Sequence, residues 1–354
     1  PQYAYRGTGM DLELLDWLNQ RTFPEESRYE DLEYAHRAYE IFAEELKNGA
    51  TTRACVFGTL HVPATELLMD LLEETGLKTF VGKVNMDRNS PTYLTEKNAE
   101  ESAENTRRWI EDCRGKYRNT RPILTPRFTP SCTDGLMFRL GELQREYSLP
   151  VQSHLSENLS EIAWVRELCP ESSCYGDCYD QFGLFGGAVP TIMAHCVYSD
   201  ETERKLMKER GVFIAHCPES NANLSSGIAP IRQYLREGQR IGLGSDVAGG
   251  SDESMFRAMA EAIKVSKLRW RLIDQKDAPL SAAEAFYMAT RGGGAFWGWV
   301  GSFEAGYEAD ILVVDDALSA HPQELSIAER LERMIYLAEK RHILHKAVAG
   351  NWVK

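Results

Sequence analysis

The run PVQSHLSE, at residues 150–157, decides how the rest of the chain is interpreted. A short apolar stretch leads to His154 where a strand should end, and Glu157 follows three residues later where a helix should begin. In a parallel βα barrel the carboxyl ends of all strands face one mouth, so a polar side chain at such an end points toward its counterparts on other strands. His154 is therefore expected to meet similar residues from neighbouring strands.

Three later runs also carry a polar side chain at the end of an apolar stretch. TIMAHC holds His195, VFIAHC holds His216, and RIGLGSD ends at Asp246. Imidazole and carboxylate groups are common ligands of divalent metals. Together with His154, these side chains predict a metal or catalytic site at the mouth of a barrel.

The sequence around these runs alternates strand and helix, which is typical of a parallel α/β fold. We count seven strands and eight helices, whereas a (β/α)₈ TIM-like barrel needs eight of each. The first long helical pattern has no strand before it, so the first barrel strand is expected to lie upstream of Pro1. A doubly wound sheet tolerates seven strands but gathers its ligands at a switch point, so the barrel is favoured. The expected strands cover residues 51–58, 77–85, 121–128, 150–155, 191–196, 212–217 and 240–246.

The last part of the chain, residues 301–354, is expected to form a small β unit after a barrel that covers residues 1–300. GSFEAGYEADILVVDD is a turn-rich approach to a strand, and a helix is expected at about residues 325–340. ILHKAVAGNWVK then predicts a hairpin whose turn is Gly350 and Asn351. Because so small a β piece cannot bury both faces, it is interpreted as the remnant of a β-sandwich that packs on the barrel or on strands outside the chain.

Composition limits the classes of function. A chain of 354 residues that is 43% hydrophobic and 26% charged is typical of a soluble globular enzyme. A net charge of −13 argues against a surface for nucleic acid or anionic lipid, and no run approaches the roughly 18 apolar residues of a membrane span. Eight scattered cysteines, several of them inside strand-like runs, favour reduced thiols and a reducing compartment. Cys169, Cys174 and Cys178 leave a structural metal site open, although loop thiols are favoured.

The runs SHLSE, MAHC, AHCPESN and GLGSDVAGG, in this order at strand ends, resemble the metal-dependent amidohydrolase superfamily, aminohydrolase branch. TPRF, the opening PQY and FVGKVNMD extend the resemblance over nearly the whole chain. The resemblance implies one Zn²⁺ per subunit, with Fe²⁺ as an alternative, held by a His-x-His pair on the first strand, a histidine on the fifth and an aspartate on the eighth. His154 and Asp246 match the last two positions, and the His-x-His pair is expected upstream of Pro1.

Two ligands alone hold a divalent ion poorly, because catalytic sites of this kind use three or more protein ligands. The chain as given is therefore not expected to be competent by itself. Three interpretations stay open: ligands outside the residues given, a truncated chain, or a relative that uses a metal-free barrel as a scaffold.

The resemblance also implies the reaction, which is zinc-dependent hydrolytic deamination of guanine to xanthine and ammonia. Asp246 is the expected acceptor of a proton from water, and Glu157 is expected to contact a ring nitrogen and to help protonate the departing ammonia. His195 is the expected hydrogen-bonding partner of the attacking oxygen. An alternative within the same chemistry is deamination of another aminated ring, such as 8-oxoguanine, a pterin or a triazine.

Recognition of a purine base needs donors, acceptors and an apolar face. Gln2, Arg127 and Phe128 are expected to supply them, although a salt-bridged arginine and a core ring are the plain alternative for the last two. His216 fits direct substrate contact and support of another group equally well. The resemblance implies a cytoplasmic homodimer. The full set of expected substrate contacts is Gln2, Arg127, Phe128, His154, Glu157, His216 and Asp246.

Overall fold

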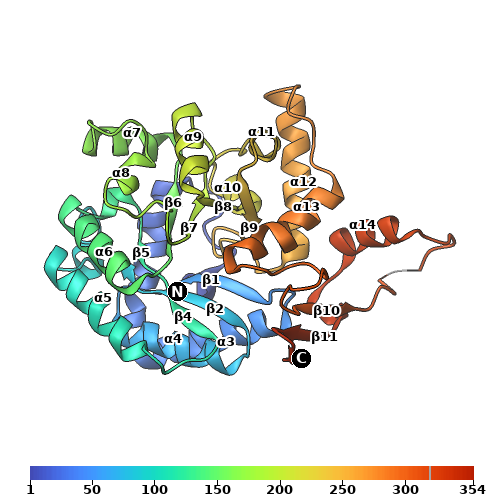
Figure 1. Cartoon of the computed structure of the whole chain (residues 1–354), viewed down its shortest axis with the longest axis horizontal. Helices are drawn as coiled ribbons and strands as arrows, with labels where there is room; N and C mark the ends of the chain where they lie inside the picture. Colours follow the sequence, from blue (N-terminus) through green and yellow to red (C-terminus); the bar gives the residue numbers. More distant parts are fainter. Residues whose placement is uncertain (319) are drawn as a thin grey trace.

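The computed structural model describes residues 1–318 and 320–354, and a parallel sheet with helices outside it forms most of the molecule (Figure 1). The strands are β1 (Arg53–Phe57), β2 (Lys78–Gly82), β3 (Val84–Asn85), β4 (Thr120–Pro122), β5 (Thr125–Pro126), β6 (Val151–Leu155), β7 (Thr191–His195), β8 (Phe213–His216), β9 (Arg240–Leu243), β10 (Ile311–Val314), β11 (Ile343–Val348) and β12 (Asn351–Trp352). The helices are α1 (Leu14–Trp17), α2 (Phe23–Ser27), α3 (Leu32–Asn48), α4 (Val62–Glu74), α5 (Ala99–Cys113), α6 (Asp134–Tyr147), α7 (Leu159–Leu168), α8 (Asp177–Asp180), α9 (Glu201–Arg210), α10 (Pro218–Asn223), α11 (Ile231–Glu237), α12 (Met255–Leu272), α13 (Ala282–Tyr287) and α14 (Ile327–Leu337).

The parallel strands occupy seven adjacent positions in the described residues, as the sequence predicts. β1 pairs with β2, β2 with β4, β3 with β5, and β6 to β9 pair in order. A bridge between Leu124 and Val151 joins the two groups. Among the described residues, β1 pairs only with β2 and β9 only with β8, so these two strands form the edges of the sheet.

Two of the expected strands are interrupted. The run 77–85 divides into β2 and β3 at Lys83, whose side chain is buried against Glu96. The run 121–128 divides into β4 and β5, which contain Pro122 and Pro126. A proline has no backbone N–H and cannot donate to a ladder, so pairing here is broken.

Side-chain caps and residues in the left-handed conformation set the boundaries of α9. Asp200 accepts a hydrogen bond from the Glu203 amide at 2.9 Å to begin α9, and Gly211 ends it with φ +69. A side-chain acceptor before the helix and a glycine after it are the usual signals. The short helices α8 and α10 carry no such periodic signal and are not predicted.

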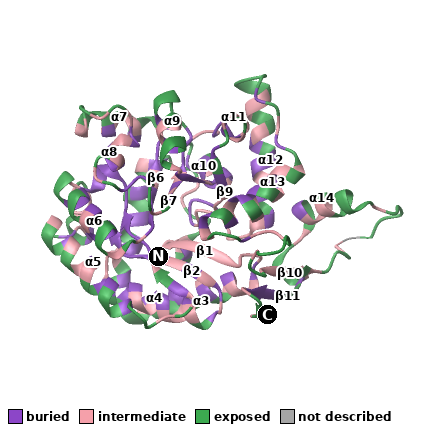
Figure 2. Ribbon diagram, viewed as in Figure 1, coloured by how far each residue is buried: buried purple, intermediate pink, exposed green. Residues whose placement is uncertain are grey.

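The core lies between the sheet and the surrounding helices. Figure 2 shows buried residues along β6 to β9 and on the inner faces of the helices. One apolar cluster extends from α3 and β2 through β8 to the C-terminal strand β11. Within the described residues, no helix combines the length and apolar character needed to cross a bilayer.

The glycine run near residue 292 packs closely, as predicted. A Cβ on Gly292 would lie 2.4 Å from the Ile241 carbonyl oxygen of β9, and one on Gly294 would lie 2.4 Å from the Val300 carbonyl oxygen. Only glycine fits such close backbone contact. The run therefore presses the chain after α13 against the edge strand.

The C-terminal part forms an antiparallel sheet in the order β10, β11, β12, which projects to one side together with α14 (Figure 1). Its hairpin turn is Ala349 and Gly350, with φ +48 and +79, and not Gly350 and Asn351 as predicted. Asn351 instead pairs with Val348 at the start of β12. Two central residues with positive φ suit the right-handed twist of a hairpin, and this shifts the turn by one residue.

Two buried cations fasten this sheet to the rest of the molecule. Arg53 of β1 donates from Nε to Asp310 at 2.8 Å and from Nη2 to Glu308 at 2.7 Å. Lys346 of β11 donates to the carbonyl oxygens of Leu46, Gly49 and Thr51, at 2.8 to 3.2 Å, around the end of α3. The C-terminal sheet therefore packs against β1 and the end of α3.

Replacing Asp310 with Asn should lower the free energy of unfolding by about 3 kcal/mol at pH 7, because buried Arg53 loses the buried anion that accepts two of its hydrogen bonds. Burial raises the pKa of Asp310, but hydrogen bonds from Arg53 and the Ala349 amide outweigh burial and leave the pKa below its ordinary value. The stabilisation is therefore present above the pKa of an unfolded aspartate, about 3.9, and disappears as the pH falls through the lower folded value. Urea unfolding at pH 7 and at pH 3 to 4 measures this.

The matched control is Glu304→Gln, which removes a carboxylate from an exposed pair with Arg291. It should change stability by less than about 1 kcal/mol at either pH. Equal effects of the two variants at pH 7 would show that the Asp310 pair does not anchor the sheet.

Candidate active site

His154 lies at the end of β6 with its ring fixed by the backbone. Its Nδ1 lies 2.6 Å from the carbonyl oxygen of Arg127, so Nδ1 carries the proton and Nε2 is free as a metal ligand. Burial and the neighbouring His195 imidazole lower the pKa of His154 to about 4. The ring is therefore neutral at physiological pH, which is the state that binds a metal.

His195 ends the next strand, β7, and its ring lies almost parallel to that of His154, with centroids 5.5 Å apart. Its Nδ1 lies 2.8 Å from Oδ1 of Asn221, which directs Nε2 toward the mouth. Burial lowers the pKa of His195, but the carboxylates of Glu157 and Asp246 more than offset burial and raise it above the ordinary value. Nε2 lies 3.4 Å from Glu157 Oε2 and 4.0 Å from Asp246 Oδ2.

Asp246 follows β9 in a left-handed backbone conformation, with φ +46. Its Oδ2 accepts a hydrogen bond from the Ser220 hydroxyl at 2.5 Å. A Cβ on Gly249 would lie 2.3 Å from that hydroxyl and 3.0 Å from Oδ2, so the loop needs glycine there. The arrangement orients the carboxylate toward the two histidines.

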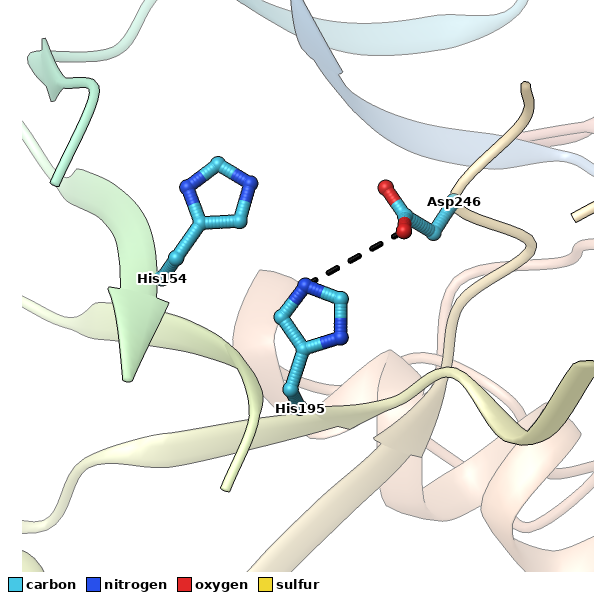
Figure 3. Close-up of side chains that lie close together, drawn as sticks. All are labelled: His154, His195 and Asp246. Atoms are coloured by element: carbon cyan, nitrogen blue, oxygen red, sulfur yellow. Dashed lines mark ion pairs between the residues drawn. The ribbon is translucent and has the colours of Figure 1, made fainter. Parts of the chain in front are cut away.

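These three side chains form one cluster (Figure 3). The possible ligand atoms of His154, His195 and Asp246 all lie within 4.8 Å of one another. Two imidazoles and a carboxylate are the donor set of many catalytic zinc sites, so the residues fit a divalent metal. The sequence analysis assigned His154 and Asp246 as ligands and His195 as a hydrogen-bonding partner of the attacking oxygen. The structure brings the His195 ring into the same group of potential ligand atoms.

No other group of three potential ligands occurs in the part of the chain that the structure describes. Cys169, Cys174 and Cys178 do not form a metal site there and are free thiols.

Glu157 lies beside the cluster and is buried. Its Oε1 accepts a hydrogen bond from the Ser226 hydroxyl at 2.8 Å, and its backbone amide donates to Oε2 of Glu161 at 3.0 Å. Asn158 caps α7 in a reciprocal arrangement with Glu161, and this holds the chain at Glu157. Burial raises the pKa of Glu157, while the charge of His195 lowers it, and the net shift is upward. A buried carboxyl group with a raised pKa beside potential metal ligands is a candidate for proton transfer.

His216 ends β8 and is almost completely buried. Neither ring nitrogen has a hydrogen-bonding partner, and burial lowers its pKa to about 3. It is not among the residues that line the main cavity. His216 is therefore buried at the end of β8 with both ring nitrogens unpaired.

A cavity of about 720 Å³ begins at this cluster and continues between the edge strands β1 and β9. Gln2, Arg127, His154 and Asp246 all contribute to its wall. Phe128 does not; its ring packs edge-to-face against Trp164 of α7, with centroids 6.2 Å apart. The structure thus brings Gln2 and Arg127 to the cavity wall, whereas contact of Phe128 with a base stays a prediction.

Arg127 and Gln2 are both held by Glu26 of α2, which sequence reasoning did not single out. Arg127 donates from Nη1 and Nη2 to the two oxygens of Glu26, and Gln2 donates to Oε1 at 2.9 Å. The guanidinium also lies 5.1 Å from the centre of the Phe23 ring. Asn221, Ser220 and Ser226 were missed in the same way, because they lie in short helices and loops without a periodic pattern.

A model of the amidohydrolase family matches residues 1–353. The chain belongs to the amidohydrolase family. Amidohydrolases of this type depend on a bound metal, and the cluster of His154, His195 and Asp246 supplies suitable ligands.

The relatives of this amidohydrolase point to one group. This chain is 40% identical over 367 residues to the guanine deaminase of Mus musculus, and the match covers 100% of this chain and 80% of that protein. It is 38% identical over 362 residues to the guanine deaminase of Dictyostelium discoideum, with the same coverage. A crystal structure of guanine deaminase from C. acetobutylicum, with guanine bound in its active site, is 48% identical, has a TM-score of 0.95, and matches 100% of this chain and 84% of that one. This likeness confirms the TIM-barrel class.

Asn221→Ala should lower the metal affinity of this amidohydrolase by about 10- to 100-fold, because the His195 ring loses the partner that orients Nε2. Competition with a chelator, followed by metal analysis of the protein, measures the change. Asn221→Asp keeps an acceptor oxygen for Nδ1 and should retain most of the affinity. Unchanged metal binding in Asn221→Ala would mean that His195 is not a ligand.

Proposed function

We propose that this protein hydrolyses guanine to xanthine and ammonia with the help of a divalent metal, which we take to be zinc. The observation that carries the proposal is the convergence of His154, His195 and Asp246 with the buried carboxyl group of Glu157, 3.4 Å from His195 Nε2, beside the cavity that His154 and Asp246 line. The similarity to guanine deaminases over the whole chain supports guanine as the substrate.

The metal would be held by His154 Nε2, His195 Nε2 and a carboxylate oxygen of Asp246. When bound, a zinc ion supplies a water molecule that is deprotonated near neutral pH. Fe²⁺ suits the same ligands. Arg127, Asn221 and Ser220 hold the three side chains in place through their hydrogen bonds.

Glu157 and Asp246 would move the protons. Asp246 has Oδ2 engaged by Ser220, and as a carboxylate it can accept a proton from the attacking water. Glu157, whose pKa is raised by burial, would donate a proton to the ring nitrogen next to the carbon that bears the amine. Glu157 would then take up the proton that Asp246 accepted from water and pass it to that amine, which leaves as ammonia. The remaining proton on the added oxygen would return to Glu157 as that oxygen becomes the new carbonyl. Water adds one oxygen to the ring carbon, so guanine and water become xanthine and ammonia.

The wider setting is also proposed on the resemblance. It includes a cytoplasmic homodimer, a role in purine breakdown, and division into a barrel at residues 1–300 and a β unit at residues 301–354. The expected further strand with a His-x-His pair, and the interpretation of the last sheet as part of a β-sandwich, stay predictions.

Removal and return of the metal tests the reaction. The full-length protein treated with a chelator should lose ammonia release from guanine, and one equivalent of Zn²⁺ per chain should restore it. Guanine should be turned over faster than 8-oxoguanine, a pterin and a triazine in the same assay. Faster ammonia release from another ring, or full activity without metal, would overturn the proposal.

Glu157→Gln should reduce turnover of guanine by about 10²- to 10⁴-fold, because the amide cannot exchange a proton with the ring. The metal content should remain near that of the unchanged protein. Glu167→Gln, on the exposed side of α7, is the matched control and should keep full turnover. An active Glu157→Gln variant would remove Glu157 from the proton-transfer role.

A further inference from the structure

Glu26 is a buried acid whose whole carboxylate is committed to the two polar residues of the cavity wall. It is 3% exposed on the short helix α2. Oε2 accepts from Arg127 Nη1 at 2.5 Å, and Oε1 accepts from Arg127 Nη2 at 3.1 Å and from Gln2 Nε2 at 2.9 Å. Neither Arg127 nor Gln2 can turn without breaking one of these bonds.

The chemistry of a carboxylate decides which way the Gln2 amide points. A carboxylate offers acceptors only, so the amide nitrogen of Gln2 must face Glu26. The carbonyl oxygen of Gln2 is then left as an acceptor for other groups. Arg127 has N–H groups beyond those bonded to Glu26, and these remain donors. Both residues line the same cavity as His154 and Asp246.

We propose that Glu26 is a positioning residue for the base-binding wall, by which we mean Arg127 and Gln2. It holds the N–H donors of Arg127 beside the carbonyl acceptor of Gln2, and this pattern selects purines with a 6-oxo group next to a ring N–H. The inference rests on the proposed function and names the residue that determines specificity. The 6-oxo group would accept from Arg127, and the ring N–H would donate to the Gln2 oxygen. Adenine presents the reverse pattern, an amino donor next to a ring acceptor, and would face like groups on both residues.

Contacts of Arg127 also fix the position of the wall relative to the cluster of His154, His195 and Asp246. Phe23, three residues before Glu26 on α2, places its ring 5.1 Å from the Arg127 guanidinium. The backbone oxygen of Arg127 orients the His154 ring at 2.6 Å. The same residue therefore fixes a metal ligand through its backbone and contributes to the wall through its side chain.

A purely structural role for this buried ion pair makes a different prediction. If Glu26 only stabilised the fold, its loss would weaken binding of all bases equally. A role in setting the donor and acceptor pattern changes the ratio between bases. The ratio is therefore the decisive quantity.

The test measures binding of hypoxanthine and adenine to the metal-loaded full-length protein by calorimetry. These bases differ in the edge in question, and neither carries the amine that guanine loses. In Glu26→Gln, the amide oxygen can keep the bond from Arg127 Nη1, and the amide nitrogen takes the place of Oε1, which accepted from Arg127 Nη2 and Gln2. That nitrogen cannot accept, so the Gln2 amide turns over and the Nη2 bond is lost. The preference for hypoxanthine over adenine should fall by at least about tenfold. For guanine turnover, KM should rise by at least about tenfold while kcat changes by less than about threefold.

Glu25→Gln is the matched control. Glu25 precedes Glu26 on the same helix, is also buried, and accepts its hydrogen bond from Tyr34 instead of a wall residue. It does not line the cavity and should leave the preference unchanged. Gln2→Met is the second variant, in case Glu26→Gln does not fold. It removes the acceptor without touching the buried pair, and it should also lower the preference by at least about tenfold.

The outcomes separate this inference from the proposed function. A wild-type protein that prefers hypoxanthine, with Glu26→Gln and Gln2→Met both losing that preference, supports the role of Glu26 even if guanine is not deaminated. Guanine turnover with an unchanged preference in a folded Glu26→Gln or in Gln2→Met overturns the role of Glu26 and leaves the proposed function standing. Equal losses for both bases, or an equal change in Glu25→Gln, also overturn it.

Discussion

The hydrogen bond between the His154 ring and the backbone oxygen of Arg127 connects the two halves of the site. It fixes Nε2 of His154 at the mouth, and it spans 2.6 Å between the end of β6 and the residue that follows β5. The side chain of Arg127 is bound by Glu26, so α2, β5 and β6 hold one another in place. A shift in any of them would move both the metal ligand and the base-binding wall. This coupling keeps the reacting carbon of a bound base at a set distance from the ion.

Burial and neighbouring charges shift the pKa values of the titratable groups at the mouth in different directions. His154 and His216 are driven toward the neutral form by desolvation, and His195 is driven toward the protonated form by the acids around it. Glu157 and Glu161 both have raised pKa values, which reach about 7 for Glu161, again mainly through burial. A cation bound among these groups would be the largest local charge, so it would favour the carboxylate forms and the neutral imidazoles. The protein thus concentrates polar groups where water is scarce and a metal can balance them.

Strands and helices could be predicted from the periodic pattern of apolar residues along the sequence. Features that depend on contacts between residues far apart in the sequence could not. The seven strand positions and the strand-tip location of His154 and Asp246 follow from apolar runs alternating with helical patterns. Glu26 could not be identified, because its significance comes from Arg127, 101 residues away in the sequence. The hairpin turn was misplaced by one residue because Asn351 is a good turn former, whereas register and twist selected Ala349 and Gly350. The contact between the rings of Phe128 and Trp164 could not be predicted either, because the two residues lie on different elements.

The three carbonyl oxygens bound by Lys346 bear on how the polypeptide folds as it is made. The end of α3 is completed by a residue that lies 300 positions later than Leu46 in the chain. During synthesis, the carbonyl oxygens at the end of α3 therefore stay hydrogen-bonded to water until β11 has left the ribosome. Long-range contacts of this kind are made late and slow the final step of folding. The contact between α3 and β11 is therefore expected to form late in folding. A nascent chain stalled before β11 would be an early target for chaperones.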